Sequence, residues 1–247
     1  MKRFWKEVGI ANIDNGWQVT LDSRGIRTQG KRAQVVPGKA LAELLASEWK
    51  AQGDTLDPSG FPHRDMADYA IDMIASGEED IAAKLMAYFE TDTLCYRADP
   101  EDALYQHQQE QWEPLLAQLE ESHGIRFQRI SGVMHKPQPP ETLAALRAHL
   151  ETLDDFVLSG MVSMASLAAS LGVALLASDE AINDPMLLWH DANLEEEWQA
   201  DRWGREEEAE ERRQQRGEDF SAAQVFVMLA QSGTLQGRSR IALNLKP

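Results

Sequence analysis

Residues 4–36 have the pattern of short strands and turns, in which apolar and polar positions alternate with a period of two. Residues 8–10 and 17–21 each follow this alternation, and Asp14-Asn15-Gly16 between them is typical of a hairpin turn. After Pro37 the apolar period becomes that of a helix, with leucines and Trp49 recurring on one side. The chain is therefore predicted to open with a small antiparallel sheet and an amphipathic helix.

The central part of the chain alternates between helical and strand-like patterns. Residues 64–89 have helical spacing with a break near Gly77, and residues 101–122 predict a further helix. Between them, Thr91-Asp92-Thr93-Leu94-Cys95-Tyr96-Arg97 is rich in residues that favour strands. We expect this stretch to be a strand that rejoins the first sheet, and residues 127–133 to be another strand.

The clearest boundary is the proline-rich stretch Pro137-Gln138-Pro139-Pro140, beyond which the pattern is helical almost to the end. We predict an α+β domain over residues 1–138 and an all-helical domain over residues 139–232. Residues 233–247 are basic and poorly patterned, which predicts a flexible tail. The fold class predicted for the whole chain is α+β.

An uncharged run over residues 156–177 is long enough to cross a bilayer. Four serines and two glycines dilute its hydrophobicity, and no Lys/Arg cluster flanks it to set an orientation. A pair of buried helices, broken near Ser170-Leu171-Gly172, explains the run equally well. We expect the buried pair, with a membrane-associated factor as the alternative.

Composition and charge then narrow the classes of partner. The chain has 41 acidic and 24 basic residues, and its net charge of −17 repels phosphate backbones and anionic lipid surfaces. We therefore expect neither nucleic acid nor a membrane as partner. A single cysteine, Cys95, excludes an internal disulfide, and no signal or transit segment opens the sequence. These features predict a bacterial cytoplasmic protein.

Gly25-Ile26-Arg27-Thr28-Gln29-Gly30-Lys31 has the spacing of a phosphate-binding loop. However, Arg32 stands where a Ser or Thr hydroxyl should hold magnesium. Residues 33–37 also look extended where a helix should begin. We expect a turn between strands rather than a nucleotide site.

No other pattern predicts catalysis, a cofactor or a metal. The six histidines lack ligand spacing, and adjacent carboxylates are too common in so acidic a chain to assign an acid and a base. Cys95 lies in a predicted strand without a nucleophile motif. A small-molecule enzyme with an acidic cleft is the alternative, and it would need convergent groups with shifted pKa values.

Residues 191–219 hold twelve Asp or Glu, five Arg and two Trp. On a helix, Leu194 and Trp198 share one face, which can pack on the core. A second set shares nearly the opposite face: Glu196, Gln199 and Trp203. On one interpretation, this face presents an acid, an amide and an aromatic to a partner. On the alternative interpretation, Trp203 packs on a neighbouring element and the acids only form a solvent-exposed face.

Seven different short motifs follow one another along the chain. They are Arg3-Phe4-Trp5-Lys6, Leu21-Asp22-x-Arg24-x-x-Arg27-Thr28-x-x-Lys31, Glu48-Trp49, Ala70-Ile71-Asp72, Thr91-Asp92-Thr93-Leu94-Cys95-Tyr96-Arg97-Ala98, Trp112-Glu113-Pro114-Leu115-Leu116 and Glu195-Glu196-x-Trp198-Gln199-x-x-x-Trp203-Gly204. Together they resemble the chaperone family that escorts the alpha subunit of the F-type ATP synthase catalytic sector. Some positions depart from that family's usual pattern and leave open which surface touches the client: Ser23, Gly25-Ile26, Phe61-Pro62-His63-Arg64 and Glu113.

The resemblance implies an N-terminal domain with a small sheet, an orthogonal-bundle-like helical C-terminal domain and no enzyme activity. It also implies that a monomer binds the free alpha subunit until beta subunits replace it. The implied partner-binding residues are Glu195, Glu196, Trp198, Gln199 and Trp203. The residues of the most specific motif, implied to serve structure or binding, are Thr91, Asp92, Thr93, Leu94, Tyr96 and Arg97.

Overall fold

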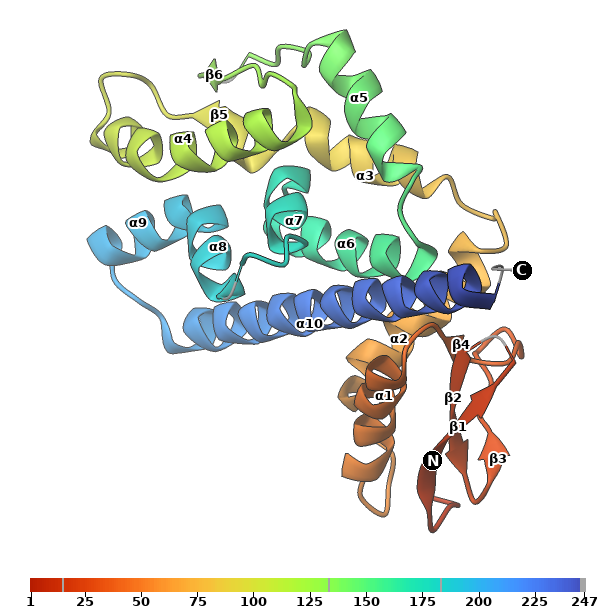
Figure 1. Cartoon of the computed structure of the whole chain (residues 1–247). Coiled ribbons are helices and arrows are strands. Elements are labelled where there is room, and N and C mark those ends of the chain that lie inside the picture. Colours follow the sequence, from red (N-terminus) through yellow and green to blue (C-terminus); the bar gives the residue numbers. More distant parts are fainter. Residues whose placement is uncertain (15, 133, 183, 245–247) are drawn as a thin grey trace. The chain divides into compact units, whose positions relative to one another are not determined.

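The computed structural model describes residues 1–14, 16–132, 134–182 and 184–244, with side chains as far as Gly233 (Figure 1). The chain forms two compact units, each discontinuous in sequence. Unit 1 combines Met1–Asp80, Asp154–Gly160 and the C-terminal part from Val225, and unit 2 combines Ile81–Leu153 with Met161–Gln224. This contact-based division is not the linear one predicted after residue 138, which stays a prediction.

Unit 1 contains the predicted antiparallel sheet. Strands β1 (Val8–Ile13) and β2 (Gly16–Leu21) pair in register from Val8 opposite Leu21 to Ile13 opposite Gly16. The short strands β3 (Arg24–Gly25) and β4 (Val35–Val36) both pair antiparallel with β2. The hairpin is therefore confirmed, although Asn15 of its turn lies outside the described residues.

Helix α1 (Lys39–Ala51) packs against β1 and β2. It buries Leu41 and Leu45, which are fully inaccessible, against a face of the sheet that includes Val19. The predicted amphipathic helix after Pro37 is thus confirmed. Burying side chains of this size stabilises the unit by about 1.5–3 kcal/mol each.

A buried carboxylate organises the next helix of unit 1. Helix α2 (Pro62–Tyr69) begins with Pro62, and the backbone N–H groups of His63 and Arg64 donate to Glu48 over 2.7 and 2.9 Å. Glu48 thereby satisfies two of the N–H groups that a helix start leaves unpaired. The helix continues as a π-helical turn (Ala70–Ile74) and stops before Gly77, at the break that the sequence predicted.

Unit 2 begins with α3 (Ile81–Glu90), a 3-10 turn (Thr93–Cys95) and β5 (Tyr96–Arg97). The expectation that this stretch is a strand of the first sheet is wrong. Asp92 caps the turn by accepting the N–H of Leu94, and β5 pairs in parallel with β6 (Ile130–Ser131) in a separate two-stranded sheet. Tertiary contacts here override the strand propensity of the β-branched residues.

Four helices of unit 2 follow the predicted pattern. Helix α4 (Ala103–His123) ends at Gly124, whose φ of 64° provides a left-handed cap. Helix α5 (Pro140–Leu150) starts at the proline-rich stretch. Helix α8 (Pro185–Ala192) leads into the acidic segment, and α9 (Leu194–Trp203) lies within it.

The uncharged run forms the predicted pair of helices, α6 (Asp155–Ala168) and α7 (Leu171–Ala177). The break lies at Ala169, which has a φ of 48°, and Ser170 caps α7 by accepting the N–H of Val173 over 2.9 Å. Every residue of α7 is buried. No helix among the described residues combines the length and the apolarity needed to span a membrane.

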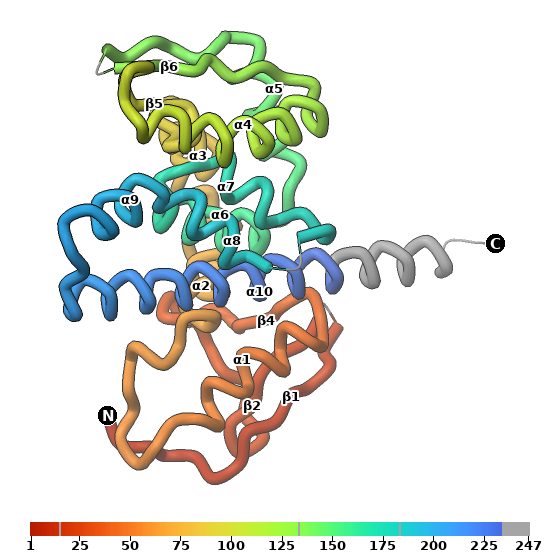
Figure 2. The backbone as a smooth tube through the Cα atoms, turned by 90° about the vertical axis from the view of Figure 1, so that its left-hand side faces the viewer, coloured from red at the N-terminus to blue at the C-terminus, as the bar shows by residue number. Residues whose placement is uncertain are grey.

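The last helix, α10 (Glu207–Asn244), is continuous up to the grey segment of Figure 2. Its first part belongs to unit 2 and its part from Val225 to unit 1. The flexible tail predicted over residues 233–247 falls almost entirely on residues whose side chains lie outside the described part. The tail therefore stays a prediction.

Candidate functional site

Helix α9 presents one buried and one exposed face, as its sequence pattern predicted. Leu194 is 5% exposed, whereas Trp203 is 81% exposed and Gln199 also lies at the surface. Trp198 is only half-buried and lies between the His107 ring at 5.4 Å and the Arg202 guanidinium at 4.3 Å. Trp198 therefore stacks at the margin of the core rather than within it.

Glu196 is half-exposed but already has ionic partners within unit 2. Arg213 of α10 donates to it over 3.1 Å, and Arg216 lies 4.0 Å away. The Arg213 side chain is 8% exposed and also pairs with Glu197 and Glu210. Burial alone would lower the pKa of Arg213, but these carboxylates raise it. Sequence spacing on α9 alone could not show this contact, because the arginines lie on another helix.

Glu195 belongs to the packing of α9 against α4. It accepts a hydrogen bond of 2.6 Å from Gln108, a fully buried side chain whose own oxygen accepts the N–H of Ala98 over 2.7 Å. Gln108 thus links the end of the Thr91–Ala98 motif to the start of the Glu195–Gly204 motif. The structure brings these two motifs together, and no pattern in the sequence indicated Gln108 as the link.

Within the first of these motifs, Asp92 is a fully buried cap for two segments. Its carboxylate accepts the N–H of Leu94 (3.0 Å), the hydroxyl of Ser170 (2.6 Å) and the N–H of Gly172 (2.8 Å). Burial raises the pKa of Asp92 to about 6, against the opposing effect of these hydrogen bonds. The residue holds the break between α6 and α7 in place.

The residues that follow Asp92 are also structural. Thr93 donates its hydroxyl to the carbonyl of Ala169 over 3.0 Å, and Leu94 is fully buried. Cys95 is buried too, and burial raises the pKa of its thiol far above the ordinary value. A thiol in this state is a poor nucleophile.

Arg97 joins the motif to Trp112-Glu113. Its guanidinium donates to the Leu94 carbonyl (2.6 Å) and to Glu113 (2.9 Å), and it lies 4.8 Å from the centre of the Trp112 ring. Trp112 in turn donates its indole N–H to the Asp191 carbonyl just before α9. The buried Arg97 therefore supports the helices that position α9.

Parts of this motif are accessible to solvent. Thr91 is exposed, and Tyr96 is half-exposed with its hydroxyl 3.0 Å from the His135 ring. The accessible residues include Thr91, Thr93 and Tyr96 in this motif and Glu195, Glu196, Gln199 and Trp203 on α9.

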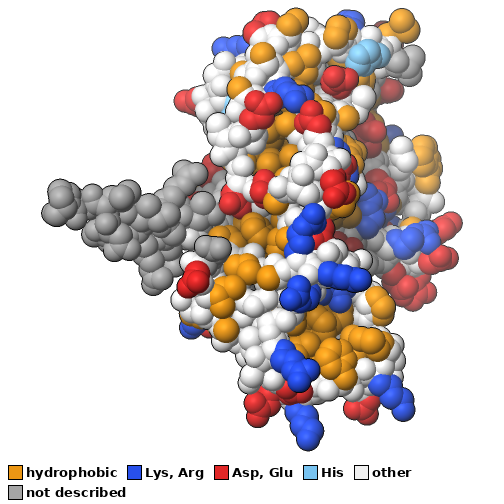
Figure 3. All heavy atoms as spheres, turned by 90° about the vertical axis from the view of Figure 1, so that its right-hand side faces the viewer, with side chains coloured by type: hydrophobic (Ala, Val, Ile, Leu, Met, Phe, Trp, Pro, Cys, Tyr) orange, Lys and Arg blue, Asp and Glu red, His pale blue; other side chains and the backbone are white. Residues whose placement is uncertain are grey.

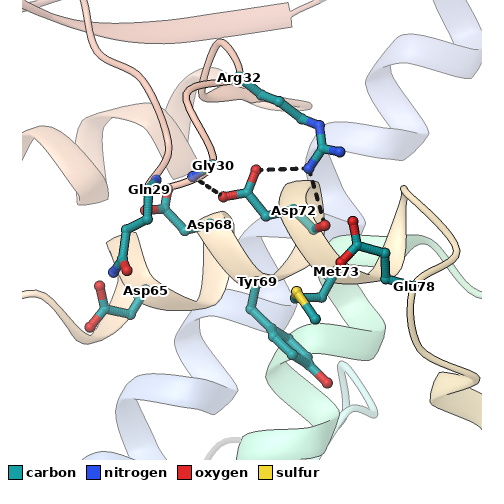
Figure 4. A pocket seen from close by; sticks show the side chains of 9 residues that line it. All are labelled: Gln29, Gly30, Arg32, Asp65, Asp68, Tyr69, Asp72, Met73 and Glu78. Atoms are coloured by element: carbon teal, nitrogen blue, oxygen red, sulfur yellow. Dashed lines mark hydrogen bonds and ion pairs between the residues drawn. The ribbon is translucent and has the colours of Figure 1, made fainter.

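The loop with phosphate-loop spacing is filled by carboxylates of unit 1 (Figure 4). The N–H of Gly30 donates to Asp72 over 2.7 Å, the N–H of Gln29 donates to Asp68 over 3.2 Å, and Arg32 pairs with Asp72 at 3.1 Å. Burial would raise the pKa of Asp72, but hydrogen bonds from Thr28, Gly30 and Arg32 hold it below the ordinary value. The loop is therefore a turn, as predicted, whose N–H groups bind internal acids.

An open cavity of about 520 Å³ lies beside this turn. Its lining combines acids and apolar groups: Gln29, Gly30, Arg32, Asp65, Asp68, Tyr69, Asp72, Met73 and Glu78. Burial raises the pKa of Asp68, which also accepts a hydrogen bond from Gln34. The two central acids hold the turn, so the cavity does not by itself indicate a catalytic site, and the described residues contain no metal-binding cluster of His, Cys, Asp or Glu.

Comparisons with known proteins agree with the motifs. A model of the ATP12 chaperone protein family matches residues 2–120. A crystal structure of Atp12 from Paracoccus denitrificans is 36% identical, with a TM-score of 0.85 over 93% of this chain and 98% of that one. The chain belongs to the ATP12 chaperone family. This is the family of F-type ATP synthase assembly chaperones that the resemblance indicated.

Other relatives extend the match. The mitochondrial protein atp12 of Schizosaccharomyces pombe is 27% identical over 224 residues, which cover 85% of this chain and 76% of that protein. The Atu1473 protein of Agrobacterium tumefaciens is 36% identical, with a TM-score of 0.86 over 92% of this chain and 85% of that one. The α+β fold with a small antiparallel sheet and a mostly helical C-terminal part is thus that of the ATP12 structures.

Proposed function

We propose that this protein binds the free alpha subunit of the F-type ATP synthase catalytic sector and shields its subunit interface until beta subunits replace it. The observation that carries the proposal is the 36% identity to Atp12 over nearly the whole length of both chains. The protein acts by binding, as a monomer in a bacterial cytoplasm, without a cofactor and without catalysis.

The physical need for such a chaperone follows from the interfaces of obligate complexes. These interfaces bury roughly 2,000–5,000 Å² and are as apolar as a protein core, so an unpartnered subunit tends to aggregate. A chaperone must cover the apolar surface and still be displaced. A net charge of −17 keeps such a protein in solution while it carries an apolar contact surface.

The contact surface that we propose is the exposed face of α9. Trp203 is 81% exposed, and an aromatic side chain this accessible gains little from the fold itself. Aromatic side chains are enriched among the residues that dominate binding energy. Gln199 and Glu196 flank Trp203 on the same face, and Glu195 and Trp198 position the helix by packing on α4.

The Thr91–Arg97 motif serves this surface indirectly. Asp92 fixes the start of α7, and Arg97 with Gln108 links the motif to α8 and α9. We therefore assign Asp92, Thr93, Leu94 and Arg97 to positioning rather than to contact with the client.

Deletion of the gene in its own bacterium tests the proposal. We expect alpha subunit to accumulate in the insoluble fraction and assembled ATP synthase to fall severalfold, with recovery when the gene is restored. Normal levels of soluble alpha subunit and of assembled enzyme in the deletion strain would contradict the proposed function.

A further inference from the structure

The sheet of unit 1 has one covered and one open face. The residues of β1 and β2 that face α1 include Val19 and Leu21, which are buried. The register places a second set on the opposite face: Gly9, Ala11 and Ile13 of β1, Gln18 and Thr20 of β2, and Val35 of β4. None of these six residues is buried. We call them the open sheet face.

The open sheet face belongs to a basic segment at the start of an acidic chain. Residues 1–36 hold seven Lys or Arg and three Asp or Glu, whereas residues 37–247 hold 17 and 38. Figure 3 shows a group of apolar side chains in the lower part of the view, with Lys and Arg side chains at its margin. A surface with an apolar centre and a charged rim is typical of a transient protein interface.

Most of the positive charge on this segment is not neutralised internally. The exposed basic residues of this segment that form no ion pair with any described residue are Lys2, Lys6, Arg24, Arg27 and Lys31. Asp22, one of the three acids, accepts hydrogen bonds from the backbone N–H groups of Glu7 and Lys6, which lower its pKa, and the nearby charges of Lys6 and Arg24 lower it further. The excess of cations is thus available to an external partner.

We propose that the open sheet face is a second docking surface for the client, and that it binds an acidic region of the alpha subunit. The proposal rests on the proposed function and adds a contact separate from α9. Charge complementarity selects the occupant, because an acidic surface gains from the unpaired cations while a basic one is repelled. The half-buried apolar positions Ala11, Ile13 and Val35 supply the centre of the contact.

A pair of charge reversals tests the basic rim. Lys6→Glu with Lys31→Glu changes the net charge by the same amount as Lys50→Glu with Lys136→Glu, at exposed positions outside the sheet segment. The dissociation constant for purified alpha subunit is measured by calorimetry from low to high salt. We expect the first pair to raise the dissociation constant about tenfold and to reduce its dependence on salt. The control pair should change the dissociation constant by less than about twofold.

A single substitution tests the centre of the face. Ala11→Asp places a negative charge opposite Gln18 on the open face, while Ala40→Asp makes the same change at an exposed position on α1. We expect only Ala11→Asp to weaken binding, with melting temperatures measured in parallel to identify any variant that fails to fold. If Ala11→Asp proves to be destabilised, the comparison of the Lys6/Lys31 pair with its control decides whether the open sheet face binds the client.

The outcomes separate the two proposals. Tight binding by the unchanged protein together with equal binding by the open-face variants would overturn this inference alone. Absence of binding by the unchanged protein would overturn both. Loss of self-association in the Lys6/Lys31 variant, with client binding intact, would show that the face binds a second copy of this chain instead of the client.

Discussion

Gly172 donates its backbone N–H to the carboxylate of Asp92 over 2.8 Å, in a site from which solvent is excluded. This contact joins residues 80 positions apart and fixes the first turn of α7. A Cβ atom at Gly172 would lie 3.1 Å from Leu119 and 3.4 Å from the Asp92 carboxylate, so a small residue suits the position. The Thr91–Arg97 motif therefore requires specific residues for a structural reason.

Asp92→Asn is expected to change how stability depends on pH. The folded state holds the Asp92 proton more tightly than the unfolded chain, with a pKa of about 6 against 3.8. The stability contributed by the protonated carboxyl is complete below pH 3.8 and is lost as the pH rises through 6, a loss of about 3 kcal/mol. The stability advantage of the unchanged protein over Asp92→Asn should therefore shrink between pH 4 and pH 7.5 in urea unfolding.

Ser170→Ala provides the control for this measurement. It removes one hydrogen bond to Asp92 but keeps the carboxyl group, so it should be less stable while retaining the pH dependence. An advantage over Asp92→Asn that stays constant or grows with pH would contradict the raised pKa.

The turn at residues 25–31 should bind no ATP. Its N–H groups at Gln29 and Gly30 already donate to Asp68 and Asp72, whose negative charges would repel a phosphate. Calorimetry with ATP and magnesium should show no saturable heat. Saturable binding that is lost in Lys31→Ala would overturn the assignment of this loop as a structural turn.

Gly30→Ala tests the same turn through stability. The added Cβ would lie 2.7 Å from the Asp72 carboxylate, so the acid must move away from the N–H of Gly30 and from Thr28. We expect a loss of about 1–3 kcal/mol in urea unfolding. Gly53→Ala is the control, because a Cβ there meets no atom within 4 Å. Equal stability of the two variants would show that the Asp72 contact contributes little.

Trp203→Ala should separate binding from stability. The side chain is 81% exposed, so its removal should leave the free energy of unfolding within about 0.5 kcal/mol. Affinity for the alpha subunit should fall at least tenfold if this aromatic anchors the contact. Leu187→Ala, at another exposed apolar side chain of unit 2, provides the comparison. Equal affinities of the two variants would remove Trp203 from the proposed interface.

Glu196→Lys should abolish assembly while the fold survives. The reversal places a cation near Arg213 and Arg216, but Arg213 keeps Glu197 and Glu210 as partners, and the site is half-exposed. We expect a loss of about 1 kcal/mol in stability and failure to complement a chaperone-deficient strain. Failure through unfolding alone would contradict a specific contact.

The choice of control for Glu196→Lys follows from the structure. The neighbouring acids are unsuitable, because Glu195 accepts a hydrogen bond from the buried Gln108 and Glu197 pairs with Arg205 and Arg213. Glu211 is exposed and has no ion pair with any described residue, so Glu211→Lys reverses the same charge without an internal contact. Complementation by Glu211→Lys is expected.

Local patterns predicted most elements but not their tertiary partners. The period-two pattern located β1 and β2, and helical spacing correctly separated Leu194 from Trp203 on α9. The prediction of a strand over Thr91–Arg97 was wrong, although the β-branched residues of this stretch favour a strand. The buried Asp92 instead bends it into a 3-10 turn through contacts with Ser170 and Gly172. Such long-range contacts leave no periodic signal in the sequence.

The sequence likewise predicted the segments of the candidate site but not the contacts between them. The motifs indicated that α9 and the Thr91–Arg97 stretch matter, but not that Gln108 connects them or that Arg213 pairs with Glu196. In the sequence, Gln108 and Arg213 are polar residues within segments that show only a helical pattern. Their buried positions become visible only when the helices are packed together.

The most direct test of the central claim is displacement of this protein from the alpha subunit. Purified alpha subunit and this protein are mixed, the complex is isolated by size-exclusion chromatography, and purified beta subunit is then added. We expect a stable complex with free alpha subunit that releases this protein as alpha–beta assemblies form. Failure to bind free alpha subunit, or retention of this protein on the alpha–beta assembly, would contradict the account.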